Sequence, residues 1–259
     1  LSMASLVLAT NSIALSESRE TSDQIAGIPE DVTLAVSDRD GNHIGSAVSI
    51  QIEGGYHWAV TNRHVAGNLN SVCLTSRMGK AYPFNVITAS SNKAQKERLD
   101  IAFLWAPLAI TQELPVATWE EQQETPGEIL RIVEATGFPS SLSNPKDKPQ
   151  LLKLKGLQVQ LLDGELEEGF DTTYTAAVQK GMSGGGVFAN NKLIAINGAH
   201  SDPLWPVEWR SRLGKPVEKA LNMKLALVSI GISTRVIRRE LRNAQVESTK
   251  TKNAHHPSK

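Results

Sequence analysis

Cysteine is almost absent from this sequence, which removes two ways of stabilising or using a protein. The single cysteine, Cys73, cannot form a disulfide within the chain. It lies in the strand-like stretch Ser-Val-Cys-Leu-Thr, where no neighbouring base or helix start activates the thiol, so we interpret it as a small apolar residue and not as a nucleophile. No H-E-x-x-H motif occurs, and the histidines lack the spacing of metal ligands. We therefore expect neither a metal nor an organic cofactor.

Net charge and long apolar runs are missing as well. The 259 residues include 27 basic and 27 acidic side chains, so the formal net charge is zero and no broad field attracts nucleic acid or anionic lipid. The fairly apolar stretch Met3–Leu15 is too short and too polar to span a bilayer. We expect no nucleic-acid partner and no membrane span, and the sequence gives no indication of the oligomeric state.

Residues 1–27 have two interpretations, a leader or a disordered N-terminus. Ala14, Leu15 and Ser16 form a small-x-small pattern that a signal peptidase accepts, which favours a secreted or periplasmic protein. The basic segment that normally precedes such an apolar stretch is missing, so a disordered N-terminus and a cytoplasmic location stay open.

The chain contains a succession of short strand patterns separated by glycine and proline. They occur at 32–36, 44–52, 56–60, 71–75, 82–89, 101–105, 128–136, 151–162, 172–178, 185–188, 192–196 and 225–230. This pattern is typical of an all-β barrel or sandwich. The proline-bearing segment Ala106–Gly127 separates two strand-rich halves. We predict a helix over 233–243, with Ser233 or Thr234 as its N-cap, and a disordered tail over 244–259.

A serine surrounded by glycines is the most informative feature. In Lys180–Phe188 the sequence reads Lys-Gly-Met-Ser-Gly-Gly-Gly-Val-Phe, with Ser183 at its centre. Glycines weaken the interior of a strand, but they allow the backbone to take unusual conformations against a substrate. The amides of Gly181 and Ser183 are then candidates for an oxyanion hole. A glycine-rich loop with an incidental serine is the competing interpretation.

A serine nucleophile needs a base and an acid that orients the base. His64 follows an apolar strand pattern, in Ala59–Gly67, and Asp100 stands at the start of the strongly apolar Ile101–Trp105. A carboxylate at such a position is costly to desolvate unless it is paired. Each residue taken alone also fits a purely structural role.

Chain order decides between two kinds of serine hydrolase. Residues Gly181–Gly185 also fit the G-x-S-x-G nucleophile elbow, which requires a helix after the serine and the order Ser, acid, His. Here three glycines follow Ser183 and make a poor helix start, and little room remains for an acid before His200. The order His64, Asp100, Ser183 instead matches the chymotrypsin arrangement.

These blocks, in this order, resemble the trypsin-like serine peptidases, most closely the bacterial disulfide-free, HtrA-like and stand-alone members. The resemblance covers about 32–243 and includes Ala135–Pro139, which is similar to a turn early in the second barrel of these proteins. It implies a chymotrypsin-like fold: all-β, with two packed antiparallel β-barrels and a C-terminal helix. The first barrel would cover about 28–115 and the second about 125–232, within a peptidase domain over 28–243.

The resemblance also implies the roles of particular residues. His64, Asp100 and Ser183 would form the catalytic triad, and the amides of Gly181 and Ser183 the oxyanion hole. Substrate binding falls to Ala177, at the base of the primary pocket, and to the pocket-wall residues Asn197, Gly198, Ala199 and His200. No acid stands at 177, so a preference for Lys or Arg lacks its usual counter-charge. Met182 replaces the usual Asp, so activity should not depend on a trypsin-style N-terminal cleavage.

The sequence therefore predicts a serine endopeptidase that hydrolyses peptide bonds in a protein or peptide substrate through an acyl-enzyme. Two alternatives stay open. One is an inactive chymotrypsin-fold binding module, and the other is an esterase that uses the same site.

Overall fold

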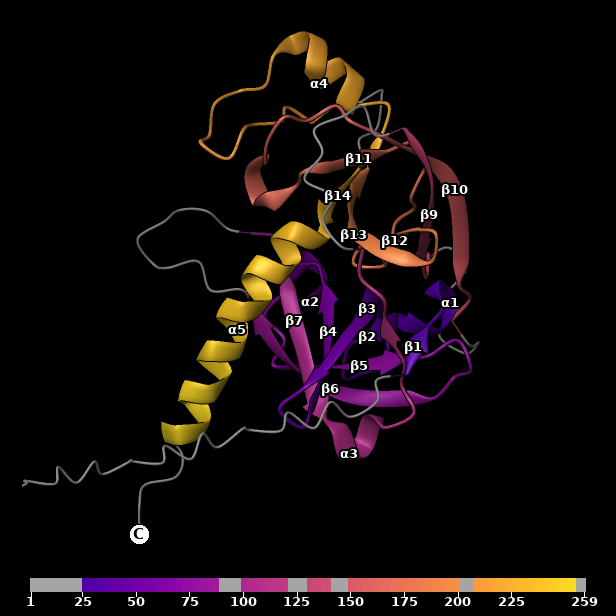
Figure 1. The fold of residues 1–259 in the computed structure, drawn as a ribbon, viewed down its shortest axis with the longest axis vertical. Coiled ribbons are helices and arrows are strands. Elements are labelled where there is room, and N and C mark those ends of the chain that lie inside the picture. Colours follow the sequence, from indigo (N-terminus) through magenta and orange to yellow (C-terminus); the bar gives the residue numbers. More distant parts are fainter. Residues whose placement is uncertain (1–24, 89–98, 121–129, 141–148, 201–206, 255–259) are drawn as a thin grey trace, which may run out of the picture.

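The computed structural model describes residues 25–88, 99–120, 130–140, 149–200 and 207–254. It contains two closed six-stranded barrels, and every strand pair in them is antiparallel (Figure 1). The first barrel has the order β2-β3-β4-β7-β6-β5, and the second has the order β10-β11-β14-β13-β12-β9. The predicted fold class, two packed antiparallel β-barrels with a C-terminal helix, is confirmed.

The strands of the first barrel are β2 Thr33–Ser37, β3 His43–Glu53, β4 Tyr56–Thr61, β5 Ser71–Thr75, β6 Ala81–Thr88 and β7 Ala102–Pro107. Those of the second are β9 Arg131–Gly137, β10 Leu152–Val159, β11 Thr172–Tyr174, β12 Gly186–Ala189, β13 Lys192–His200 and β14 Ser229–Ser233. The parallel pair β1 (Ala26–Gly27) and β8 (Val116–Ala117) lies outside both barrels. Short helical turns are α1 Pro29–Val32, α2 Arg63–Ala66, α3 Leu108–Thr111, η2 Glu167–Gly169 and α4 Lys219–Leu225.

Tight turns set the register of two hairpins. Gly54 and Gly55, with φ of 60° and 76°, join β3 to β4, and Asn190 and Asn191, with φ of 50° and 62°, join β12 to β13. Two-residue hairpin turns with both φ values positive match the right-handed twist of the strands, which is why glycine and asparagine occupy them. The alternation of the strands then decides which side chains enter each barrel.

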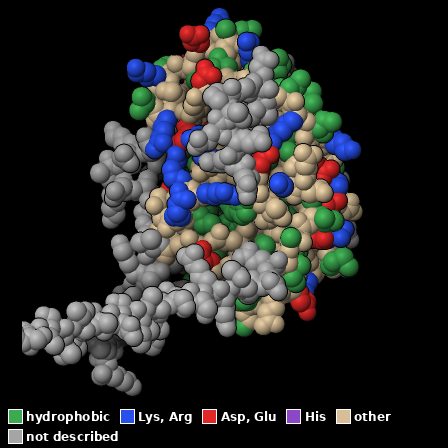
Figure 2. Space-filling model, in the orientation of Figure 1, with side chains coloured by type: hydrophobic (Ala, Val, Ile, Leu, Met, Phe, Trp, Pro, Cys, Tyr) green, Lys and Arg blue, Asp and Glu red, His purple; other side chains and the backbone are tan. Residues whose placement is uncertain are grey.

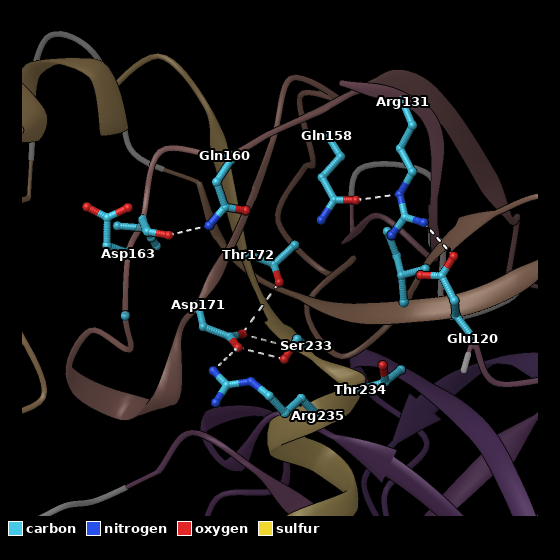
Figure 3. A pocket seen from close by; sticks show the side chains of 13 residues that line it. Glu120, Arg131, Gln158, Gln160, Asp163, Asp171, Thr172, Ser233, Thr234 and Arg235 are labelled. Atoms are coloured by element: carbon cyan, nitrogen blue, oxygen red, sulfur yellow. Dashed lines mark hydrogen bonds and ion pairs between the residues drawn. The ribbon is translucent and has the colours of Figure 1, made fainter. Parts of the chain in front are cut away.

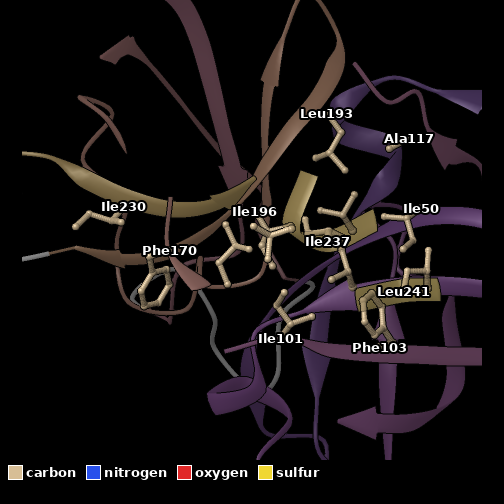
Figure 4. Packing of buried hydrophobic residues seen from close by; sticks show 14 of the residues in the cluster. Ile50, Ile101, Phe103, Ala117, Phe170, Leu193, Ile196, Ile230, Ile237 and Leu241 are labelled. Carbon is tan, nitrogen blue, oxygen red and sulfur yellow. The ribbon is translucent and has the colours of Figure 1, made fainter. Parts of the chain in front are cut away.

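The apolar core has three parts. One cluster fills the first barrel and another fills the second. The third lies between the barrels and under the C-terminal helix α5 (Thr234–Ala254), where Ile237 and Leu241 pack among Phe103 of the first barrel and Leu193 and Ile196 of the second (Figure 4). Each such fully buried side chain contributes about 1.5–3 kcal/mol. The helix therefore holds the two barrels in one arrangement.

Helix α5 is longer than predicted. Ser233 precedes it, and its Oγ accepts the N–H of Val236 at 3.5 Å, as expected of an N-cap. The helix continues to Ala254, where a disordered tail was expected from residue 244 on, and its last turns extend past the strands in Figure 1. Residues 244–254 contain no glycine or proline to end the helix at residue 244, and Ala244 is still buried in the core cluster beneath it.

Several predictions fall on other parts of the chain. Residues 1–24 of the expected leader and 255–259 of the expected tail lie outside the described residues. Among the helices that are described, none is long and apolar enough to cross a membrane.

Candidate active site

His64 lies on α2, the turn that follows β4. Asn62 enters the turn in an extended conformation, and Gly67 leaves it with φ of 55°. This short turn lifts the imidazole off the end of the strand, and 53% of the His64 side chain is exposed. The ring is thus open to a substrate on one side while its other side faces Asp100.

Asp100 contacts His64 at two points. Its Oδ2 lies 2.7 Å from His64 Nδ1, and its Oδ1 accepts the backbone N–H of His64 at 2.9 Å. The carboxylate is buried, with 3% of its side chain exposed, so these bonds offset the cost of desolvating it. The hydrogen bond that His64 donates to Asp100 raises the pKa of His64, although burial opposes the rise. A carboxylate in this position favours the tautomer with its proton on Nδ1, which leaves Nε2 as the basic nitrogen.

The second barrel supports Asp100 from behind. The backbone N–H of Asp100 donates to the carbonyl of Glu168 at 2.8 Å, and Glu168 has φ of 63° inside the turn η2. Asn62 donates to the Asp100 carbonyl at 3.1 Å from the first barrel. Sequence reasoning did not find Glu168, because a backbone contact of this kind leaves no pattern in the sequence.

Ser183 lies in the glycine-rich loop before β12. Its backbone carbonyl accepts the N–H of Ser46, in the first barrel, at 2.9 Å. A Cβ added to Gly184 would lie 2.2 Å from the Ser46 carbonyl oxygen and 3.1 Å from the backbone nitrogen of Asn62, so only glycine fits there. This close approach brings the loop against the strand end that carries His64.

The Ser183 hydroxyl is turned toward the second barrel. Its Oγ donates to the Gly198 carbonyl at 3.3 Å, and within the described part of the chain it makes no hydrogen bond to His64. The hydroxyl must therefore exchange this bond for one to His64 before its proton can be transferred.

The peptide between Lys180 and Gly181 has a fixed direction. The Lys180 carbonyl accepts the N–H of Ser140 at 2.8 Å. Since the C=O and N–H of a trans peptide point in opposite directions, the Gly181 N–H points away from Ser140. Among the described residues, neither the Gly181 nor the Ser183 amide donates to a protein acceptor. The two amides are available to an incoming oxygen.

The predicted specificity residues differ in what they offer a substrate. Ala177 is exposed, Ala199 is half-buried, and Gly198 presents the carbonyl already described, while the side chain of His200 lies outside the described residues. Asn197 is fully buried. Because the side chain of Asn197 is hydrogen-bonded inside the barrel, only its backbone could line the pocket, and that role stays a prediction.

Asn197 supports the nucleophile loop from below. Its Nδ2 donates to the carbonyls of Thr136 and Met182 at 2.8 and 3.2 Å, and its Oδ1 accepts the hydroxyl of Tyr174 at 2.8 Å. Met182 is also fully buried. In digestive peptidases, an ion pair with a newly formed N-terminus holds this loop. Here the apolar side chain of Met182 and the buried side-chain amide of Asn197 hold it instead.

A second serine–histidine pair occurs in the first barrel, but it is structural. His57 Nε2 lies 2.6 Å from Ser49 Oγ, and both residues are fully buried. Because the Ser49 hydroxyl donates its one proton to the carbonyl of Pro115 at 2.5 Å, it accepts from His57. Burial lowers the pKa of His57 to about 4. The pair has no path to a substrate.

A polar cavity of about 350 Å³ lies in the second barrel (Figure 3). Four of its charged side chains form two ion pairs within its wall: Arg131 with Glu120, and Arg235 with Asp171 at 3.0 Å. None of the described residues that line it is a histidine or a cysteine. The hydroxyl of Ser233 is itself bonded to the Asp171 carboxylate at 2.6 Å, so these polar groups satisfy one another within the wall.

Basic side chains gather on one face of the molecule (Figure 2). Three of the arginines near the start of α5, Arg212, Arg235 and Arg239, form ion pairs with the nearly buried Glu165. These pairs offset part of the positive charge.

No group of three side chains able to hold a metal ion occurs in the described part of the chain.

Comparisons with solved structures show what this fold is similar to. An HtrA-type protease, AlgW, bound to a decapeptide is 21% identical over 79% of this chain, with a TM-score of 0.52. The protein Rv3671c of M. tuberculosis in an inactive form is 15% identical over 84% of this chain and 88% of its own, with a TM-score of 0.54. A serine endoprotease of Yersinia pestis is 19% identical over 83% of this chain and 64% of its own, with a TM-score of 0.52. At these identities the likeness establishes the fold.

The extent of these matches is uneven. The chain covers 51% of the length of the AlgW structure, about half. No curated protein sequence matches the chain. The family model of the trypsin-like peptidase domain matches residues 45–196, which include His64, Asp100 and Ser183. The chain therefore belongs to the trypsin-like peptidase domain family of serine proteases.

Proposed function

We propose that this protein is a serine endopeptidase whose triad is His64, Asp100 and Ser183, with the amides of Gly181 and Ser183 as its oxyanion hole. The observation that carries the proposal is the two-point contact of Asp100 with His64, beside a nucleophile loop packed against the same strand ends. That contact fixes both the tautomer and the direction of the imidazole, which a serine nucleophile requires.

The first chemical step joins Ser183 to the substrate. The hydroxyl turns from the Gly198 carbonyl to His64, gives its proton to Nε2, and attacks the scissile carbonyl carbon. The carbonyl oxygen becomes an oxyanion, which the Gly181 and Ser183 amides stabilise. One such donor lowers the barrier by about 3–4 kcal/mol.

The acyl-enzyme then forms and is hydrolysed. The protonated His64, held by the Asp100 carboxylate, gives its proton to the leaving amine as the C–N bond breaks. Water enters, loses a proton to His64, and attacks the acyl carbon; the bond from that carbon to Ser183 Oγ then breaks, His64 returns the proton to Oγ, and the carboxylic acid product leaves. AlgW has been solved with a decapeptide and with a tripeptide, which supports peptides as the substrate class to be tested.

A fluorophosphonate probe tests the nucleophile directly. We expect covalent labelling of the wild-type protein and none of Ser183→Ala, with intact mass confirming a single adduct. Labelling of both proteins equally, or of neither, would contradict the proposal and favour a binding module.

Turnover of a diverse peptide library tests the reaction class. We expect cleavage of internal peptide bonds, abolished by Ser183→Ala. Hydrolysis of small esters with no cleavage of any peptide would instead assign an esterase. The library also reports the residue preferred before the cleaved bond.

A further inference from the structure

Ser46, on β3 of the first barrel, makes both of its side-chain hydrogen bonds within the described residues to the second barrel. It is fully buried. Its Oγ donates to the carbonyl of Gly181 at 2.8 Å and accepts the backbone N–H of Phe138 at 2.8 Å. Its backbone N–H donates to the Ser183 carbonyl at 2.9 Å, and its carbonyl accepts the hydroxyl of Thr61 at 2.6 Å. One residue of the first barrel thus holds the nucleophile loop of the second at two points.

The hydroxyl bond to Gly181 bears on the oxyanion hole. Gly181 has φ of +93°, and a Cβ added there would lie 2.5 Å from the backbone nitrogen of Ser140, so glycine is required. Glycine is also the residue whose adjoining peptides rotate most freely. Two hydrogen bonds to carbonyls restrain that rotation, in addition to the bond from the Met182 N–H to the Gln179 carbonyl at 3.0 Å, which holds the same peptide as the Ser46 hydroxyl does. Ser140 holds the carbonyl of the peptide before Gly181, and the Ser46 hydroxyl holds the carbonyl of the peptide after it.

These two contacts act on the same N–H. Fixing the peptide planes on both sides of Gly181 fixes its φ and ψ, and with them the direction of its amide hydrogen. Oxyanion donors lower the barrier only when they are already aligned, because realigning them during the reaction costs the energy they would contribute. A donor that is present but free to turn therefore loses much of its effect.

We propose that Ser46 is a positioning residue, whose hydroxyl aligns the Gly181 amide of the oxyanion hole from the opposite barrel. The inference rests on the proposed function, since it assigns Gly181 to the oxyanion. It makes the geometry of the hole depend on how the two barrels are docked. Ser46 touches neither the substrate nor the reacting atoms.

Strand β3 supplies a matched control. Ser49 is also fully buried, and its hydroxyl also makes two hydrogen bonds, to His57 and to the carbonyl of Pro115. Those bonds lie within the first barrel and its flank, away from the nucleophile loop. Ser46→Ala and Ser49→Ala therefore remove the same group from the same strand, and only the first touches the oxyanion hole.

The test compares kcat, KM, thermal stability and the affinity for a peptide boronate, whose tetrahedral adduct occupies the oxyanion hole. For Ser46→Ala we expect kcat to fall about 10- to 100-fold, less than the loss of a whole donor, with KM changed less than about twofold. Boronate affinity should fall in parallel, and the affinity for the product peptide should not. For Ser49→Ala we expect a similar loss of thermal stability and an unchanged kcat.

The possible results separate the two claims. A wild-type protein without activity or probe labelling overturns the proposed function. An active wild type with equal kcat losses in the two variants, or an unchanged kcat in Ser46→Ala, overturns the role of Ser46 alone. If Ser46→Ala does not fold, Ser46→Cys provides the same comparison. Its thiol is a weaker donor of similar size, so kcat should fall less than in alanine and KM should stay constant.

Discussion

Replacing Asp100 by Asn tests the triad at its best-defined contact. The asparagine amide has one acceptor oxygen and one NH₂ group, whereas the carboxylate has two acceptors. The backbone N–H of His64, which points at Oδ1, can only donate, so the amide oxygen must face it. The NH₂ group then faces His64 Nδ1, where Oδ2 lies in the wild type.

This orientation has one consequence for the imidazole. A donor facing Nδ1 makes that nitrogen the acceptor, so the ring proton moves to Nε2. Nε2 then cannot take the proton of the nucleophile, and the positive charge formed during attack loses its counter-charge. In a triad of this type the wrong tautomer lowers kcat about 10⁴-fold. That corresponds to about 5.4 kcal/mol of transition-state stabilisation.

The assay is kcat for a peptide found in the library, with thermal unfolding measured in parallel. Asp171→Asn is the control, since Asp171 is another nearly buried carboxylate, whose side chain is bonded to Ser233 and Arg235 and not to His64 or Ser183. We expect Asp171→Asn to lower thermal stability and leave kcat within about threefold of the wild type. A kcat for Asp100→Asn within about tenfold of the wild type would refute the reasoning.

Three further predictions follow from pKa shifts and packing. Asp100 raises the pKa of His64, and only the neutral ring accepts a proton, so the acid limb of kcat/KM should lie above pH 6.5; a midpoint below 6.5 contradicts this. Burial lowers the pKa of His57 to about 4, so between pH 6.5 and 4 the unfolded state binds a proton that the folded state does not. The free energy of unfolding should therefore fall as the pH falls through this window, by up to about 3 kcal/mol. In urea unfolding, His57→Gln should show a flatter pH dependence than the wild type over the same window. Gly184→Ala should abolish activity, because Gly184 has φ of +82° and the new Cβ would lie 2.2 Å from the Ser46 carbonyl oxygen. It should also lower the melting temperature more than Gly41→Ala, since Gly41 has φ of +83° but open space around it. Equal losses of melting temperature would mean that backbone strain alone accounts for the effect.

Local patterns in the sequence determined most of the fold. Alternating strands, asparagine and glycine turns and the absence of any long apolar run predict an all-β chain, because these preferences act between near neighbours. The chain order of His64, Asp100 and Ser183 by itself excludes a nucleophile elbow. The predicted end of the helix at residue 243 differs from the structure, because the amphipathic pattern fades there while no glycine or proline stops the helix before Ala254.

The tertiary structure decided what the side chains and backbone groups do for one another. Asn197 was predicted as a pocket wall, and the fold uses its side chain as a support beneath the loop. The Ser46–Gly181 bond joins residues 135 apart, and the carbonyl of Glu168 reaches Asp100 from the other barrel. Such contacts depend on how two barrels dock and often use backbone groups that every residue carries. They therefore leave no local pattern to read, whereas strands and turns do.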